Sequence, residues 1–125
     1  MRDTGIRLIG ADVRASIVEC QRCQEACLDT VTHALRRGGD YAEEELIGAL
    51  LDATDVCRTS IDFLRRGSPL RARTCGVCAE ICQRAAEACQ AFGDDPAMRA
   101  CAEACRRCAA ACRAIAREGW LAQVA

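Results

Sequence analysis

Apolar and polar residues follow each other along the chain at the spacing of three and four residues that is typical of α-helices. Three short segments interrupt this pattern, at residues 37–40, 67–69 and 92–96. Each joins a glycine, which commonly ends a helix, to an Asp, Ser or Pro, which commonly begins one. The pattern predicts four helices, at about residues 11–37, 41–66, 69–91 and 96–118.

The four predicted helices are similar in length, and only a few residues connect them. Short connections favour antiparallel neighbours, so we expect an all-α fold, an antiparallel up-down-up-down four-helix bundle. A chain of 125 residues is also the size of one domain. We therefore expect a single domain over residues 1–125.

Cysteine occupies most inward positions of three of these helices, at the 3-4 spacing of a heptad seam. These eleven residues are Cys20, Cys23, Cys27, Cys75, Cys78, Cys82, Cys89, Cys101, Cys105, Cys108 and Cys112. The second helix instead presents mainly leucine on its seam, and its one thiol is Cys57. The sequence thus predicts a bundle whose core is lined by cysteine.

Counting residues outward from the turns places thiols of different helices at similar heights. The expected layers are Cys27, Leu50 or Leu51, Cys82 and Cys105; then Cys23, Thr54, Cys78 and Cys108; then Cys20, Cys57, Cys75 and Cys112. Beyond the first layer, toward the turns at 37–40 and 92–96, lie His33, Cys89, Met98 and Cys101. That end alone adds a histidine and a methionine to the cysteines.

Composition and charge narrow the classes of function. The net charge is −1 and every cationic residue is an arginine, which argues against a strongly basic polyanion binder, so no nucleic-acid partner is expected. No stretch approaches the roughly 18 apolar residues of a membrane span. The first residues lack the apolar core of an export signal, so we expect a cytoplasmic protein without a membrane partner.

Disulfides and inert packing explain the cysteines poorly. Cytoplasmic thiols are normally kept reduced. Residues three or four apart on a helix hold their Cβ atoms about 5–6 Å apart, whereas a disulfide needs roughly 3.5–4.5 Å. Cysteine can also act as a small hydrophobic residue, but eleven of them would bury little apolar surface. A metal site is the better interpretation.

Iron–sulfur and zinc sites fit less well than copper. The spacing Cys101-x3-Cys105-x2-Cys108 matches a radical-SAM motif, but it falls within a helix of a chain too short for the associated barrel. A zinc ion with four thiolates would bring a charge of about −2 into the core. The nearby cations all lie off the seam: Arg22, Arg84, Arg106, Arg107 and Arg113.

Cu(I) is a soft monovalent ion that prefers thiolate and thioether ligands. If each thiolate bridges two ions and each ion takes two thiolates, the ratio approaches ~1 ion per cysteine and every unit is neutral. Neutral units avoid the cost of burying charge in an apolar core. The sequence therefore predicts multiple Cu(I) ions bound by the core thiols.

The Cys-x3-Cys pairs Cys23/Cys27, Cys78/Cys82, Cys101/Cys105 and Cys108/Cys112 resemble those of the bacterial copper storage proteins, above all the cytosolic branch. The resemblance covers residues 13–118. It implies a four-helix bundle that binds many Cu(I) ions, assembly as a homotetramer, and entrance of ions through one end. By position, these pairs with Cys20, Cys57, Cys75 and Cys89 would be the storage ligands, and His33 and Met98 would be candidates for the entrance.

Simpler roles for the last two residues stay open. His33 can be an exposed residue that interacts with the dipole at a helix C-terminus, and Met98 can be ordinary packing. Because the second helix carries few thiols, we expect a smaller capacity than that of many family members.

The expected function is cytoplasmic Cu(I) storage or sequestration without catalysis, since the chain has one histidine and neither a catalytic triad nor a phosphate-binding loop. The alternative is a redox or electron-transfer protein that uses an iron–sulfur cluster or reversible disulfides. Zn(II), Ag(I) and Hg(II) also remain possible occupants, because soft ions share an affinity for thiolate.

Overall fold

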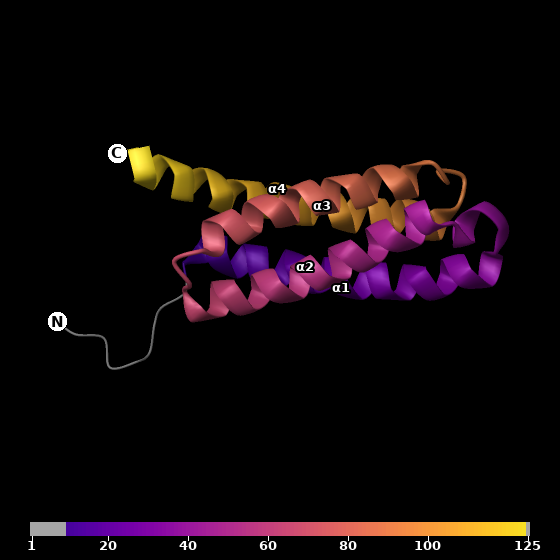
Figure 1. Cartoon of the computed structure of the whole chain (residues 1–125), viewed down its shortest axis with the longest axis horizontal. Helices are drawn as coiled ribbons and strands as arrows, with labels where there is room; N and C mark the ends of the chain where they lie inside the picture. Colours follow the sequence, from indigo (N-terminus) through magenta and orange to yellow (C-terminus); the bar gives the residue numbers. More distant parts are fainter. Residues whose placement is uncertain (1–9, 125) are drawn as a thin grey trace.

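The protein folds as a four-helix bundle (Figure 1). The computed structural model describes residues 10–124, with side chains to residue 122. Its elements are α1 (Ala11–Arg37), a 3-10 helix η1 (Gly39–Ala42), α2 (Glu44–Arg66), α3 (Arg71–Gln90) and α4 (Pro96–Val124). Within the described residues there is no β-strand. α1 packs against α2 and α4, and α3 packs against the same two helices, so the chain runs up and down around one core.

The helix ends follow from local sequence. α1 is followed by Gly38, which has a φ of 70°, and α2 by Gly67 in the left-handed conformation with a φ of 63°. Ser68 N–H donates to the carbonyl of Phe63, a bond that closes the last turn of α2. The bounds differ most at two places: η1 delays the start of α2 to Glu44, and α4 continues to Val124; α3 is shorter than expected by two residues at its start and one at its end.

Cysteine and small residues fill the core, as the pattern predicts. All twelve cysteines are buried and none forms a disulfide. Leu46, Leu50 and Leu64 of α2 supply larger apolar side chains. The start of α3 and the last turns of α4 approach each other closely: a Cβ atom added to Gly119 would lie 2.1 Å from the Cβ atom of Ala72. None of the described helices has the length and apolar character needed to cross a membrane.

Candidate metal centre

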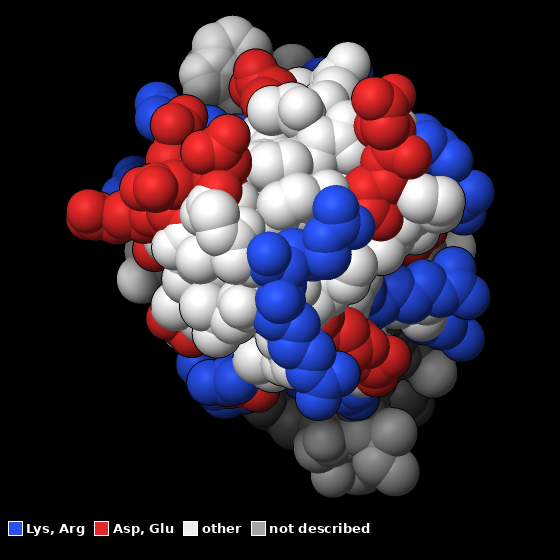
Figure 2. Space-filling model, turned by 90° about the vertical axis from the view of Figure 1, so that its right-hand side faces the viewer, with Lys and Arg blue, Asp and Glu red and all other residues white. Residues whose placement is uncertain are grey.

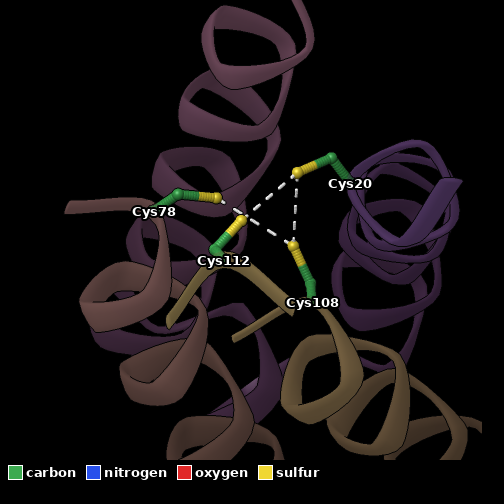
Figure 3. Close-up of side chains that lie close together, drawn as sticks. All are labelled: Cys20, Cys78, Cys108 and Cys112. Atoms are coloured by element: carbon green, nitrogen blue, oxygen red, sulfur yellow. Dashed lines mark hydrogen bonds between the residues drawn. The ribbon is translucent and has the colours of Figure 1, made fainter. Parts of the chain in front are cut away.

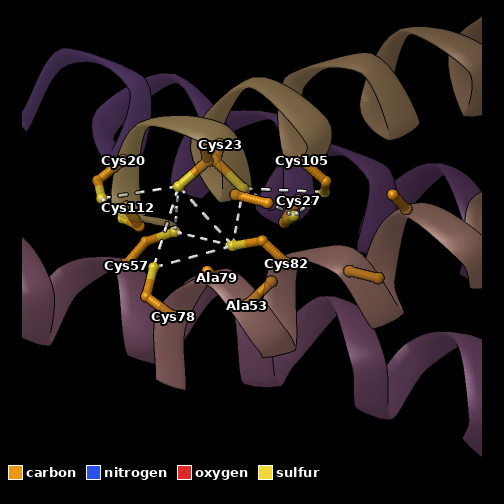
Figure 4. Packing of buried hydrophobic residues seen from close by; sticks show 14 of the residues in the cluster. Cys20, Cys23, Cys27, Ala53, Cys57, Cys78, Ala79, Cys82, Cys105 and Cys112 are labelled. Carbon is orange, nitrogen blue, oxygen red and sulfur yellow. Dashed lines mark hydrogen bonds between the residues drawn. The ribbon is translucent and has the colours of Figure 1, made fainter. Parts of the chain in front are cut away.

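The cysteines form a column of thiols along the bundle axis (Figure 4), which we call the thiol column. Nine of its sulfurs are linked by contacts of 3.5–4.0 Å: those of Cys20, Cys23, Cys27, Cys57, Cys78, Cys82, Cys105, Cys108 and Cys112. The shortest joins Cys27 Sγ to Cys105 Sγ at 3.5 Å. All four helices contribute, because each turns its seam toward the same axis.

Three groups of sulfurs within the column are compact enough to hold metal ions. The Cys112 cluster comprises Cys20, Cys78, Cys108 and Cys112 (Figure 3); the Cys57 cluster comprises Cys23, Cys57, Cys82 and Cys108; the Cys105 cluster comprises Cys23, Cys27 and Cys105. Within each cluster the sulfurs lie within 4.8 Å of one another. Metal–sulfur bonds of about 2.3 Å place the sulfurs of one site roughly 4 Å apart, so little movement is needed to bind an ion.

The clusters are joined through shared sulfurs. Cys108 belongs to both four-thiol clusters, and Cys23 belongs to the Cys57 and Cys105 clusters. A thiolate can bridge two soft ions, so a shared cysteine can link neighbouring sites. The arrangement therefore suits a chain of connected metal–thiolate units better than separate mononuclear sites.

The other three thiols are those of Cys75, Cys89 and Cys101, and the first two hold their protons. The neighbouring Cys112 thiol and burial raise the pKa of Cys75. The neighbouring Cys101 thiol and burial raise the pKa of Cys89 in the same way. A metal ion must therefore displace protons when it binds at these ends of the column.

The surroundings of the column carry no buried charge among the described side chains. The polar residues buried there are Ser16, Thr30, Thr54 and Ser60, all neutral hydroxyls. Arg84 and Arg107 are exposed and pair with Glu80 and Glu103. Four thiolates around a divalent ion would therefore keep a net negative charge without a buried cation to offset it.

The order of the layers differs from the expected one. Cys57 shares a cluster with Cys23 and Cys82, instead of lying at the height of Cys20, Cys75 and Cys112. The reason is η1, whose residues cross the end of the bundle before α2 begins at Glu44. Cys57 therefore lies nearer that end than a count along a straight helix indicates.

A polar cluster, which we call the Asp95 cluster, covers the end of the bundle beside η1. Asp95 Oδ2 accepts hydrogen bonds from His33 Nε2 at 2.8 Å, Tyr41 Oη at 3.0 Å and Arg37 Nη1 at 3.3 Å. Its Oδ1 accepts a bond from Ala97 N–H at 2.9 Å at the start of α4. The bond from His33 is the main reason that the pKa of Asp95 is lowered to about 2. Asp95 thus ties α1 and η1 to α4.

The two residues proposed for the entrance lie at this end but differ in exposure. The His33 side chain is 32% exposed and is held by Asp95, whereas Met98 is fully buried. Figure 2 views this end, where acidic and basic side chains surround an uncharged area crossed by basic side chains. Metal binding by His33 and Met98 stays a prediction. Asp95 was not predicted as a partner of His33, although the Asp-Pro pair at 95–96 marks a helix start.

Comparisons with known proteins agree with this geometry. A crystal structure of the Nmul_A1745 protein from Nitrosospira multiformis is 33% identical, with a TM-score of 0.79 over 86% of this chain and 96% of that chain. Cu(I)-bound copper storage protein BsCsp3 is 28% identical, with a TM-score of 0.78 over 84% of this chain and 98% of that chain. A Streptomyces lividans Ccsp mutant is also 28% identical, with a TM-score of 0.77 over 85% of this chain and 93% of that chain.

Sequence comparison points the same way. The chain is 29% identical over 75 residues to the uncharacterized cysteine-rich protein YhjQ of Bacillus subtilis (strain 168). The aligned region covers 60% of this chain and 69% of the relative. A family model described as "Copper storage protein" matches residues 10–117. Because that match spans the whole bundle except the end of α4, the chain belongs to the copper storage protein family.

Proposed function

We propose that this protein stores or sequesters multiple Cu(I) ions in its thiol column, by thiolate binding and without catalysis. The observation that carries the proposal is the continuity of the column: nine sulfurs lie in one network of 3.5–4.0 Å contacts. A single isolated metal site would need no more than four cysteines. A connected network supports binding of many ions that share ligands.

Charge balance favours Cu(I) as the cargo. Each Cu(I) ion that replaces one thiol proton leaves the charge of the core unchanged, and the proton is released to solvent. A zinc ion with four thiolates would leave about −2 among neutral neighbours. Since the buried polar side chains of the described residues are all hydroxyls, successive Cu(I) ions load at a lower electrostatic cost than successive Zn(II) ions.

Ions would enter at the end covered by the Asp95 cluster. His33 is partly exposed there, and Met98 lies inside the same end. A surface imidazole and a buried thioether could therefore pass Cu(I) to the thiols of α3 and α4 that lie nearest this end. To bind an ion, His33 must first break its hydrogen bond to Asp95. Replacing Asp95 with alanine should therefore speed copper loading without changing the final number of ions, whereas Met98→Leu should slow loading.

The protein would act in the cytoplasm as a homotetramer. The groove between α2 and α3 supports self-association because it exposes apolar side chains, with Leu70 50% and Val77 54% exposed. Its η1 end is lined mainly by acidic residues, Glu43, Glu44 and Glu45 with Arg84, and its other end by Arg73 with Asp55. A two-fold pairing of antiparallel copies would set the acidic end of one against the arginine of the other. Val77→Asp should lower the mass in sedimentation equilibrium, whereas Ala110→Asp, on an exposed position of α4, should not.

Anaerobic titration of the fully reduced protein with Cu(I) tests the storage function. Ultraviolet thiolate-to-metal absorbance should rise to a plateau near ~10 equivalents, because each thiol bridges two ions. A competing chelator in the same samples separates tight binding from weak binding, and a parallel Zn(II) titration is the control. Saturation at one or two ions, or a brown iron-containing protein, would favour the redox alternative instead.

A further inference from the structure

One buried hydroxyl in the core has no partner. Ser60 Oγ, on α2, is fully buried and makes no hydrogen bond with any described residue. The other buried hydroxyls of the described residues have partners: Thr54 donates to the carbonyl of Leu50 at 2.9 Å, Thr30 donates to the carbonyl of Ala26 at 2.6 Å, and Ser16 Oγ lies 3.4 Å from Cys112 Sγ. An unpaired buried hydroxyl is destabilising. Ser60 therefore needs an explanation beyond packing.

The register of the helices places Ser60 at the level of the Cys112 cluster. In the Cys57 cluster, α1 to α4 contribute Cys23, Cys57, Cys82 and Cys108 in that order. One helical turn further along each helix, in the same direction along the bundle, come Cys20, Ser60, Cys78 and Cys112. Three of these are cysteines of the Cys112 cluster (Figure 3), and the position on α2 is the serine. Ser60 thus occupies the position on α2 at which a cysteine would give this level thiols from all four helices.

A serine at this level gains an acceptor only when copper is present. A thiol sulfur is a weak acceptor, whereas hydrogen bonds to ionised acceptors are shorter and roughly twice as strong. When Cu(I) binds, each thiol proton that it replaces leaves for solvent, and the sulfur becomes a metal-bound thiolate. The hydroxyl keeps its own proton and can donate it. Ser16, already beside Cys112, offers a second donor at the same cluster.

We infer that Ser60 is a positioning residue for stored copper: its hydroxyl donates to a thiolate sulfur of the Cys112 cluster in the loaded protein and is left unpaired in the metal-free protein. The inference rests on the proposed function. Ser60 would then favour the loaded state, because its hydroxyl is buried in both states and gains a hydrogen bond only in the loaded one. The same serine limits this level of the column to thiols from three helices.

Two variants and two measurements test the inference. Ser60→Ala removes the unpaired hydroxyl, and Thr54→Val removes a buried hydroxyl on the same helix that already has a backbone partner. In Ser60→Ala, the melting temperature of the metal-free protein should stay the same or rise. In a chelator competition, about one Cu(I) ion per chain should be lost at a roughly tenfold lower chelator concentration. Thr54→Val should retain copper as the wild type does.

A third variant tests the placement alone. Ser60→Cys supplies the missing thiol and should raise the saturating copper content by about one ion per chain. Unchanged capacity would overturn the placement of Ser60 on the column. If Ser60→Ala destabilises the metal-free protein and leaves copper retention unchanged, Ser60 is only structural and the inference is wrong. A wild type that binds only one or two ions would instead refute the storage function itself.

Discussion

Cys108 is the cysteine whose loss should most reduce copper capacity. Its sulfur lies 3.6 Å from that of Cys20, 3.8 Å from that of Cys57, 4.0 Å from that of Cys78 and 3.7 Å from that of Cys82. These contacts make it a member of both four-thiol clusters. Cys108→Ala therefore removes one ligand from each of two neighbouring groups of sites.

The expected loss can be estimated from the sharing of ligands. If a thiolate shared by two clusters bridges two ions and a thiolate outside the clusters adds one, Cys108→Ala should cost about two tightly bound Cu(I) ions per chain. Cys89→Ala is the matched control, because Cys89 is equally buried but lies outside all three clusters. Its loss should cost about one ion. In the metal-free protein both variants should lose similar stability, about 1 kcal/mol, because each deletes one sulfur-sized group from a fully buried position.

The assay is a Cu(I) titration of both variants in the presence of a competing chelator, with thiols counted before loading. Urea unfolding of the metal-free proteins checks that each variant is folded and equally stable. Equal copper losses in the two variants would refute the idea that shared sulfurs link the clusters. A larger loss in Cys89→Ala would place the tightest sites at the end of the column instead.

Three further predictions concern stability. Gly119→Ala should destabilise the protein by about 1–3 kcal/mol in denaturant unfolding, because its Cβ would overlap that of Ala72, whereas Gly48→Ala, with nothing within 4 Å, should stabilise it by roughly 0.5–1 kcal/mol. Because His33 lowers the pKa of Asp95 from 3.8 to about 2, the stability lost in Asp95→Asn should be present above about pH 4 and should shrink as the pH falls from 4 through 2. Copper loading should raise the melting temperature, and a chelator should reverse the rise; no change would mean that ions do not bind the folded core.

Much of the fold could be predicted because the sequence repeats one simple pattern. Cysteines spaced three and four apart identify the inward faces of α1, α3 and α4, and the leucines of α2 identify the fourth face. Glycine and proline at the turns separate the helices. The sequence did not reveal η1, because residues 39–42 carry no pattern that distinguishes a 3-10 turn from the start of a helix.

The thiols were predictable as a set, but their grouping was not. Which sulfurs meet depends on how far each helix is displaced along the axis, and η1 shifts α2 by an amount that residue counting misses. Ser60 was missed for a related reason. A serine on a helix is usually exposed, and only the register of all four helices places this one at the level of a thiol cluster.

The close approach of sulfurs from different helices also has a consequence for protein that holds no metal. Cys27 and Cys105, on α1 and α4, have their sulfurs 3.5 Å apart, so an oxidant that reaches the core can join such pairs with a modest movement of the helices. Each bridge consumes two ligands at once. Oxidation should therefore lower the capacity in steps of two thiols, and the amount of copper that the protein can accept depends on the reducing power of its surroundings. Ions already in place occupy the same sulfurs, so a filled column protects the thiols that hold it.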